Sequence, residues 1–190
     1  MDREGKDKEI LAVLRRAIKG EWDGYHFYVE AAERSADPAG QGTFRSLAGA
    51  EEEHLHLLLV EHQSLSTGQG WMDPDEAMTR EIEVDITKPL PGEEFALPAE
   101  SPFAATWAAY EVDGLSGDLA ALEFGMEMER DFYKMYQEAA EQAEDLLARQ
   151  AYEFLMKEEN KHFKLLRDAY DYLSDNEHWW DDWELPFFEG

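Results

Sequence analysis

The sequence contains no cysteine, which excludes disulfide bonds, thiolate metal ligands and thiol nucleophiles. Basic residues are also scarce, with 17 Lys and Arg against 44 Asp and Glu, for a formal net charge of −27. Nucleic acids and anionic membranes both require a basic surface, so we expect neither as a partner. No apolar run is long enough to span a bilayer, and the N-terminus MDREGKDKEI is too charged for a secretory signal. We therefore expect a cytoplasmic protein that attracts cations.

Helical periodicity dominates what is present. Apolar residues recur mostly at steps of three or four, which predicts long helices at about 7–36, 38–66, 116–142 and 144–173. The crossover at about 67–115 is rich in proline; within it we expect short helices near 74–81 and 101–110 and an extended piece at 82–86. Short, long and short connections predict a four-helix bundle in which the second and third helices run parallel. We assign residues 1–175 to the bundle and 176–190 to a C-terminal tail.

The two halves of the chain repeat each other at an offset of 108 positions. EWDGYHFYVEAAE, which begins at Glu21, corresponds to ERDFYKMYQEAAE, which begins at Glu129. The offset continues through the following helices, where four residues have identical counterparts: Leu47, Glu51, His54 and Leu58 match Leu155, Glu159, His162 and Leu166. The chain is therefore predicted to be a duplicated helical hairpin.

The segment GAEEEHLHLLL, residues 49–59, contains two overlapping Glu-x-x-His spacings. Only the pair Glu51 and His54 has a counterpart in the second half, because lysines stand at the positions corresponding to Glu53 and His56. Residues three and four apart share a helix face, so the repeated pair lies on the same face as the core leucines. We expect the other polar side chains of this helix to face solvent: Glu52, Glu53, His56 and His62.

Glu21 and Glu129 also lie on the predicted inner faces of their helices, each 30 positions before the Glu of a Glu-x-x-His pair. The core would then hold four carboxylates and two imidazoles at one level: Glu21, Glu51, His54, Glu129, Glu159 and His162. Four buried carboxylates could not all stay ionised without cations, and two divalent metals would balance their charge. Di-iron and di-manganese bundles use this ligand pattern. Carboxylate and imidazole ligands together suit iron or manganese, with zinc possible; the alternative is a relic site that has lost its metal.

Four tyrosines lie one or two helical turns from Glu21 or Glu129: Tyr25, Tyr28, Tyr133 and Tyr136. They are either core aromatics whose hydroxyl groups bind a neighbouring carboxylate, or residues with a redox or supporting role beside the metals. We favour the first interpretation and keep all four as candidate site residues. The tail carries an aromatic cluster, which we expect to pack on the bundle or across a dimer, the alternative being a docking peptide: Trp179, Trp180, Trp183, Phe187 and Phe188.

At these residues the sequence resembles the rubrerythrin and ferritin-like di-iron carboxylate family. The motifs are EWDGYHFY, ERDFYKMY, LAGAEEEH and FLMKEENKH, in helices that cover about residues 10–66 and 116–173. The resemblance implies an all-α, ferritin-like four-helix bundle with a carboxylate-bridged di-iron centre. Its implied roles are bridging for Glu51 and Glu159 and terminal for Glu21 and Glu129, with one histidine on each metal. The implied activities are peroxide reduction, dioxygen reduction and ferrous oxidation.

Two features depart from the usual rubrerythrin pattern. A rubredoxin-type domain needs four cysteines, so we expect electrons to come from an external redox partner. Rubrerythrins usually carry a further carboxylate one turn from the helix-three ligand, and none stands one turn from Glu129, so the ligand set resembles the symmetric one of bacterioferritin-type centres. We expect a homodimeric oxidoreductase that reduces peroxide or dioxygen. The alternatives are a non-catalytic iron-binding or storage protein and a scaffold with a structural dimetal site.

Overall fold

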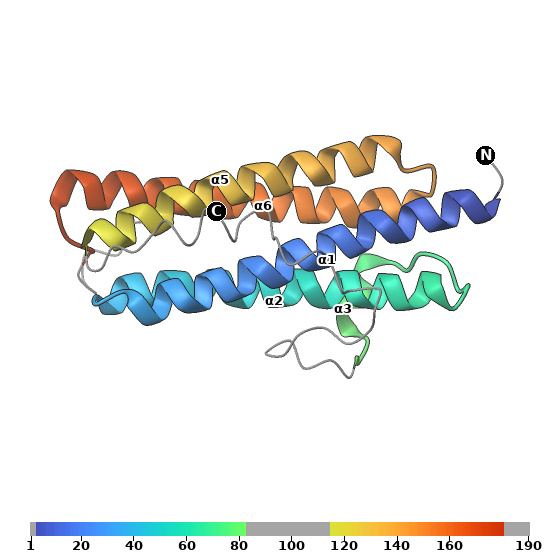
Figure 1. Cartoon of the computed structure of the whole chain (residues 1–190), viewed down its shortest axis with the longest axis horizontal. Helices are drawn as coiled ribbons and strands as arrows, with labels where there is room; N and C mark the ends of the chain where they lie inside the picture. The colour runs from blue at the N-terminus through green and yellow to red at the C-terminus, as the bar shows by residue number, and fades with distance from the viewer. Residues whose placement is uncertain (1–2, 83–114, 181–190) are drawn as a thin grey trace.

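The computed structural model describes residues 3–82 and 115–180, which form helices and turns without any β-strand. The bundle consists of four long helices: α1 (Arg3–Arg34), α2 (Pro38–Ser66), α5 (Leu115–Gln142) and α6 (Leu146–Asn176) (Figure 1). A single-turn helix, α3 (Pro74–Thr79), follows α2. The predicted all-α, ferritin-like bundle is confirmed. The short helix predicted at 101–110 and all but the first residue of the extended piece at 82–86 lie outside the described residues.

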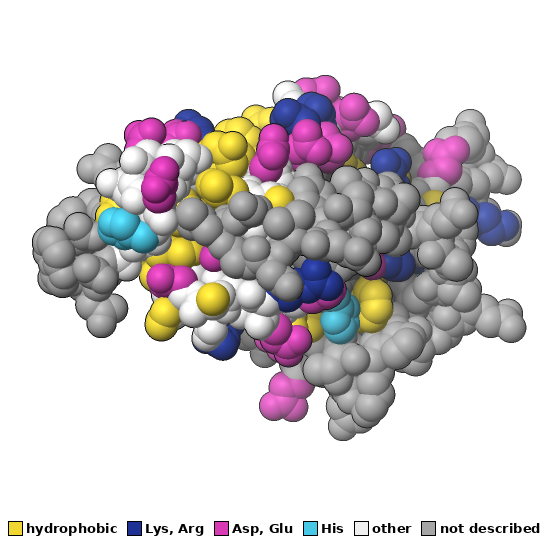
Figure 2. Space-filling model, turned by 60° about the vertical axis from the view of Figure 1, so that its left-hand side comes forward, with side chains coloured by type: hydrophobic (Ala, Val, Ile, Leu, Met, Phe, Trp, Pro, Cys, Tyr) yellow, Lys and Arg dark blue, Asp and Glu magenta, His cyan; other side chains and the backbone are white. Residues whose placement is uncertain are grey.

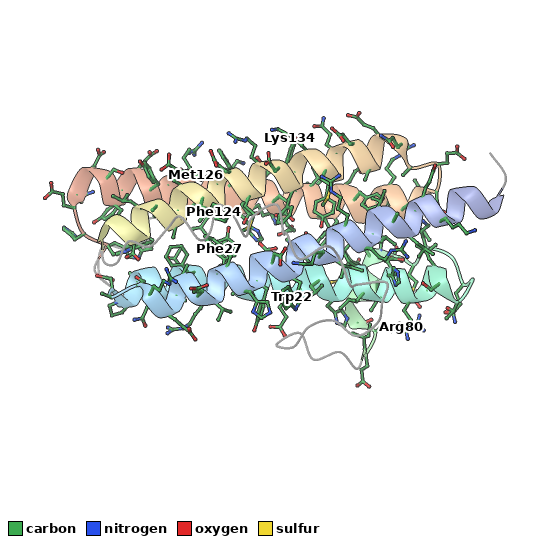
Figure 3. All side chains as sticks on the ribbon, in the orientation of Figure 1. Trp22, Phe27, Arg80, Phe124, Met126 and Lys134 are labelled. Carbon is green, nitrogen blue, oxygen red and sulfur yellow. The ribbon has the colours of Figure 1, made fainter. Side chains whose placement is uncertain are left out.

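The four long helices form two antiparallel hairpins, α1 with α2 and α5 with α6 (Figure 1). Helices α2 and α5 run in the same direction, as the long crossover between them predicts. The hairpins meet where α1 crosses α5, and there Phe27 and Phe124 point toward one another with ring centroids 4.7 Å apart (Figure 3). Within the described residues, no helix combines the length and apolar character needed to cross a membrane.

An aspartate caps the second helix of each hairpin. Asp37 accepts a hydrogen bond from the backbone N–H of Ala39 at 2.8 Å. Asp145 accepts from the N–H groups of Leu147 and Ala148 at 2.8 and 3.3 Å. Such caps satisfy backbone donors that the first turn of a helix leaves unpaired. The two aspartates stand 108 positions apart, so the tight turn is itself part of the duplication.

The core is a continuous apolar stripe along the bundle axis. On α1, Leu14 and Tyr28 are fully buried, seven positions before and after Glu21, which is buried too. The corresponding stripe on α5 runs through Leu122, Glu129 and Tyr136, with the same burial. A heptad spacing keeps residues on one helix face, so each glutamate is held in the core by the apolar residues on either side.

Helix α2 is buried on more than the face that meets the core. His62 is only 9 % exposed, so the expectation that it faces solvent is wrong, and His56 is half-buried. Glu52 and Glu53 are exposed, as expected. The chain folds back after α2, and α3 packs against both α2 and α6. The C-terminal half of α2 therefore is not an open surface, a fact that periodicity within one helix could not show.

The duplication continues beyond the helices into two tryptophans. Trp71 follows α2 and Trp179 follows α6, again 108 positions apart. Trp179 is 3 % exposed, lies edge-on to Phe44 with ring centroids 6.1 Å apart, and donates from Nε1 to Asp118 Oδ2 at 2.7 Å. Trp71 lies edge-on to Tyr152, the counterpart of Phe44, at 5.4 Å. Each tryptophan thus follows the second helix of its own hairpin and packs against an aromatic ring of the other hairpin.

In the tail, Trp179 packs on the bundle as expected, and Trp180 lies against it with ring centroids 5.1 Å apart. The close approach of Trp179 to α2 needs a residue without a side chain at position 40. A Cβ atom on Gly40 would stand 2.8 Å from Trp179 Cε2, closer than real Cβ contacts. The other aromatic residues of the tail lie outside the described residues: Trp183, Phe187 and Phe188.

Candidate metal centre

All six predicted ligands come together in the core, one or two from each long helix. Helix α1 supplies Glu21 and α5 supplies Glu129; α2 and α6 each supply a Glu-x-x-His pair. The four carboxylates are completely buried, and the histidines are nearly so, with His54 3 % and His162 7 % exposed. The inward stripes predicted for each helix therefore converge at one level of the bundle.

The histidine of each hairpin approaches the carboxylates of both hairpins. His54 Nδ1 lies 3.2 Å from Glu159 Oε1 and 3.4 Å from Glu21 Oε2. His162 Nδ1 lies 3.4 Å from Glu51 Oε1 and 3.7 Å from Glu129 Oε2. The two imidazole rings stack with centroids 5.3 Å apart. One ligand atom from each residue of the two Glu-x-x-His pairs lies within 4.8 Å of the other three, close enough for a shared metal site.

Most of the atoms in this cluster that could bind a metal lack a hydrogen-bond partner. Among the described residues, none is found for either carboxylate oxygen of Glu51 and Glu159, for Oε2 of Glu21 and Glu129, or for Nδ1 of His54 and His162. Buried polar atoms without partners are rare and costly in proteins. Six carboxylate oxygens and two imidazole nitrogens that converge in one core fit a pair of divalent cations.

Hydrogen bonds from two tyrosines distinguish one pair of glutamates in the cluster from the other pair. The Tyr28 hydroxyl donates to Glu129 Oε1, and the Tyr136 hydroxyl donates to Glu21 Oε1, each across to the other hairpin. These carboxylates therefore offer one free oxygen each, whereas Glu51 and Glu159 offer two. That difference matches terminal and bridging ligands, respectively.

The other two candidate tyrosines do not reach the cluster. Tyr25 and Tyr133 are only half-buried, and within the described part of the chain no hydrogen bond joins either of them to the four carboxylates. The ring of Tyr25 instead meets His26 edge-on, at 5.0 Å. The residue seven positions after Glu21 or Glu129 therefore faces the opposite hairpin, and the residue four positions after it does not.

Two supporting aromatic residues were missed by the sequence reasoning. The ring of Phe44 stacks on Tyr28 with centroids 6.5 Å apart and an interplanar angle of 21°. The ring of Tyr152 stacks on Tyr136 at 6.3 Å and 24°. Phe44 and Tyr152 occupy corresponding positions of the duplication, so the 108-residue offset is the signal that could have found them.

The four carboxyl groups do not share one protonation state. Burial, followed by repulsion from neighbouring carboxylates, raises the pKa of Glu21 to about 8 and that of Glu159 well above its usual range. Burial also opposes ionisation of Glu51 and Glu129. Repulsion from Glu129 adds to this effect at Glu51. The close approach of neighbouring carboxyl groups and imidazoles outweighs both effects and lowers the pKa of Glu51 and of Glu129. Without metal, Glu21 and Glu159 therefore favour the protonated form, and Glu51 and Glu129 favour the ionised form.

The histidines complete the charge balance. Burial alone would lower the pKa of each imidazole, but the surrounding carboxylates raise it, to about 12 for His162 and well above the usual range for His54. Both imidazoles therefore favour the charged form beside the carboxylates that favour ionisation. Two divalent metals would offset all four carboxylates and leave both imidazoles neutral, as metal ligation requires.

The fold and the site define a class: a ferritin-like helical bundle with a buried Glu and His cluster that fits a di-iron centre. The family model described as Rubrerythrin matches residues 12–89 and 96–170, which include both helical hairpins. The chain therefore belongs to the rubrerythrin family. Comparison with curated proteins and with solved structures finds no match.

Proposed function

We propose that this protein is a non-haem di-iron oxidoreductase that reduces peroxide or dioxygen with electrons from an external donor. The observation that carries the proposal is the set of eight unpartnered ligand atoms on six buried side chains, arranged with two-fold symmetry between the hairpins. Membership of the rubrerythrin family supports iron as the metal. The acidic composition supports attraction of cations toward the site; Figure 2 shows acidic side chains at several places on the face in view, more of them than Lys and Arg.

The residues divide the work of holding the metals. Glu51 and Glu159 would hold the pair as bridging ligands, and Glu21 and Glu129 would hold it as terminal ligands. His54 and His162 would bind one metal each through Nδ1. Iron bound there would supply one electron from each ion for a two-electron reduction of the oxidant.

The surrounding side chains hold this arrangement in place and keep water out. Tyr28 and Tyr136 fix the outer oxygen of each terminal carboxylate, which aims the other oxygen at the metal position. Fully buried leucines flank both Glu-x-x-His pairs, including Leu47 and Leu155 one turn before the glutamates. A dry apolar lining strengthens electrostatic interactions within the site and helps set its redox potential.

The test uses two glutamates that lie two positions apart on α2. Glu51→Ala should abolish binding of the metal pair, measured by elemental analysis of protein purified without chelators, and Glu159→Ala should do the same. Glu53→Ala should bind metal like the wild type, because Glu53 is exposed. The reduced wild-type protein should then show an optical change on addition of peroxide, and both core variants should lose it. Wild-type protein that binds metal but does not respond to peroxide or dioxygen would contradict the oxidoreductase proposal.

The acidic surface also fits iron binding or storage, in which oxidation of ferrous iron only loads the protein. Storage requires a shell of many subunits around a mineral core. We propose a homodimer instead, and native mass spectrometry measures the difference. A cage of many subunits would favour storage, whereas a dimer that turns over peroxide would favour the enzyme.

A further inference from the structure

Two chains of aromatic side chains lead away from the metal-binding cluster, and the duplication relates one to the other. Each chain takes its first two rings from one hairpin and its tryptophan from the end of the other hairpin. One runs from Tyr136 to Tyr152 to Trp71, with ring centroids 6.3 and 5.4 Å apart at its two steps. It begins at Glu21, whose Oε1 accepts a hydrogen bond from the Tyr136 hydroxyl. The rings follow one another in near contact, from the centre of the bundle toward its end.

The second chain has the same geometry but a different chemistry. It runs from Tyr28 to Phe44 to Trp179, with centroids 6.5 and 6.1 Å apart. Phenol and indole groups can lose one electron to a strong oxidant in a protein, whereas the benzene ring of phenylalanine cannot. Only the chain through Tyr152 is therefore oxidisable at every position.

The two chains also end differently. Trp179 is 3 % exposed and is held in the core by its hydrogen bond to Asp118. Trp71 is more exposed and, together with Tyr152, lines a cavity of about 530 Å³ at the end of the bundle. The cavity lies between the beginning of α1, the end of α2 and the turn that joins α5 to α6. A cavity of this size can hold a small molecule of one or two rings.

The walls and rim of the cavity restrict what it can bind. Apolar side chains from α1 and α2 form part of its wall: Ile10, Val13 and Leu65. Its acidic residues lie near the helix ends: Glu9, Glu144 and Asp145. Among the described residues that line it, none is Lys or Arg. Anions are thus disfavoured, and a neutral or cationic aromatic compound is favoured.

We propose that this cavity binds a small neutral or cationic aromatic one-electron reductant, of the phenylenediamine or hydroquinone class, and that its electrons reach the metal centre through Trp71, Tyr152 and Tyr136. The inference rests on the proposed function, since it names where the external donor binds. The second chain does not transfer electrons in this way, because Phe44 cannot be oxidised.

Each passage removes one electron from the donor and delivers one electron to the oxidised centre. The donor becomes a radical with one more positive charge, and a hydroquinone then releases a proton to water. Two donor molecules therefore supply a two-electron reduction. Tyr136 passes its phenolic proton to Glu21 along their hydrogen bond when it is oxidised, and takes the proton back when it is reduced. Tyr152 exchanges its proton with water in the cavity that it lines. No bond between heavy atoms forms or breaks.

The first experiment follows oxidation of N,N,N′,N′-tetramethyl-p-phenylenediamine by the iron-loaded protein and peroxide. Tyr152→Phe should lose most of the rate of donor oxidation, because it gives this half the residue that Phe44 already provides in the other. Trp71→Phe should do the same. Matched controls are Tyr170→Phe and Trp180→Phe, both partly buried residues outside the chain, and these should keep the wild-type rate. Iron content should match the wild type in all four variants, and thermal unfolding should show that each variant is folded at the assay temperature.

The second experiment needs no metal and so separates this inference from the proposed function. N-Methylacridinium, a cationic aromatic photo-oxidant, is bound to the metal-free full chain and excited with a light pulse. Transient absorption should show a tryptophan radical that converts to a tyrosine radical in the wild type. In Tyr152→Phe that conversion should be lost, while the tryptophan radical still forms.

A tyrosine radical of wild-type yield in Tyr152→Phe, or no quenching of N-methylacridinium by the wild type, would overturn the inference. A wild-type rate of tetramethyl-p-phenylenediamine oxidation in Tyr152→Phe would do so as well. Failure of the reduced iron protein to react with peroxide would instead contradict the proposed function, and the photochemical result would still decide the path.

Discussion

Single residues of one type have different roles in this protein, and Glu51 and Glu53 are the clearest case. They stand two positions apart in one acidic run, yet Glu51 is completely buried and Glu53 is exposed. A buried carboxylate is costly unless it is protonated, hydrogen-bonded or bound to a cation. The protein uses protons for this purpose before metal binds, and the redistribution of those protons gives the first prediction.

Loading the site with two divalent metals should release protons at pH 7 from Glu21, Glu159, His54 and His162, whose pKa values are all raised. All four groups must lose their proton to become ligands, so metal and protons compete. Apparent affinity should therefore fall as the pH is lowered across the neutral range, and fall more steeply below about 8, where Glu21 is also protonated. Titration of the metal-free protein with ferrous iron under argon in a pH-stat measures the release. No proton release would contradict this account of the cluster.

Glu61 provides a pH-dependent stability that does not involve the metal. Burial raises its pKa from 4.5 to about 7, although the Met72 N–H donates to its carboxylate at 3.1 Å. Because the folded-state pKa is raised, the neutral form is favoured and stability is lost as the pH rises through about 7. Glu61→Gln keeps an acceptor for Met72, so it should leave the melting temperature unchanged near pH 4.5 and raise it at pH 8. Thermal unfolding at the two pH values measures this; an equal effect at both would contradict the raised pKa.

At the scale of elements, the duplicated unit is larger than a pair of helices. It includes the capping aspartate at the turn, the Glu-x-x-His pair, the ring that stacks on the tyrosine and the tryptophan that ends the unit. Asp37, Phe44 and Trp71 correspond to Asp145, Tyr152 and Trp179. Each tryptophan follows one hairpin and packs against a ring of the other: Trp179 on Phe44 of α2, and Trp71 on Tyr152 of α6. These contacts help to hold the two hairpins together.

The two caps allow a matched test of the turns. Asp37→Ala and Asp145→Ala should each reduce the free energy of unfolding by about 1 kcal/mol, because each leaves backbone N–H groups of the first helical turn without an acceptor. Asparagine caps helices as well as aspartate does, so Asp37→Asn and Asp145→Asn should cost little. Urea denaturation of metal-free protein measures all four variants. An equal loss in the Asn and Ala variants would show that charge, and not capping, is responsible.

For the whole molecule, the cluster joins the two hairpins at the middle of their contact. Each hairpin supplies three of the six side chains, and each Tyr hydroxyl reaches across to a glutamate of the other hairpin. Unpartnered polar atoms at that position weaken the metal-free fold, because burial without a partner costs free energy. Metal binding should therefore act on the association of the two halves as well as on the local site.

Ferrous iron in excess should raise the melting temperature of the wild type markedly, since a ligand held 100-fold above its Kd stabilises the folded state by about 2.7 kcal/mol. Glu51→Ala should show no such rise, and Glu53→Ala should show the full rise. Scanning calorimetry under argon measures it. An equal rise in Glu51→Ala would show that the metal binds elsewhere, on the acidic surface.

The sequence by itself determined the four long helices, the parallel course of the second and third, and the convergence of six polar residues on the core. Periodicity fixes which face of a helix is buried, and the 108-residue offset separates Glu51 and His54 from Glu53 and His56. These features depend on contacts within one helix or on exact repetition, so they can be read along the chain.

Only the tertiary structure decided the features that depend on approach between distant segments. It placed the hydroxyl groups of Tyr28 and Tyr136 on Glu129 and Glu21, and it left Tyr25 and Tyr133 half-buried outside the cluster. The reason is that the residue seven positions after each of these glutamates faces the other hairpin. It also buried His62, which the spacing of residues within α2 did not predict. Helical spacing gives the direction of a side chain, whereas the packing of the other hairpin determines what the side chain meets there.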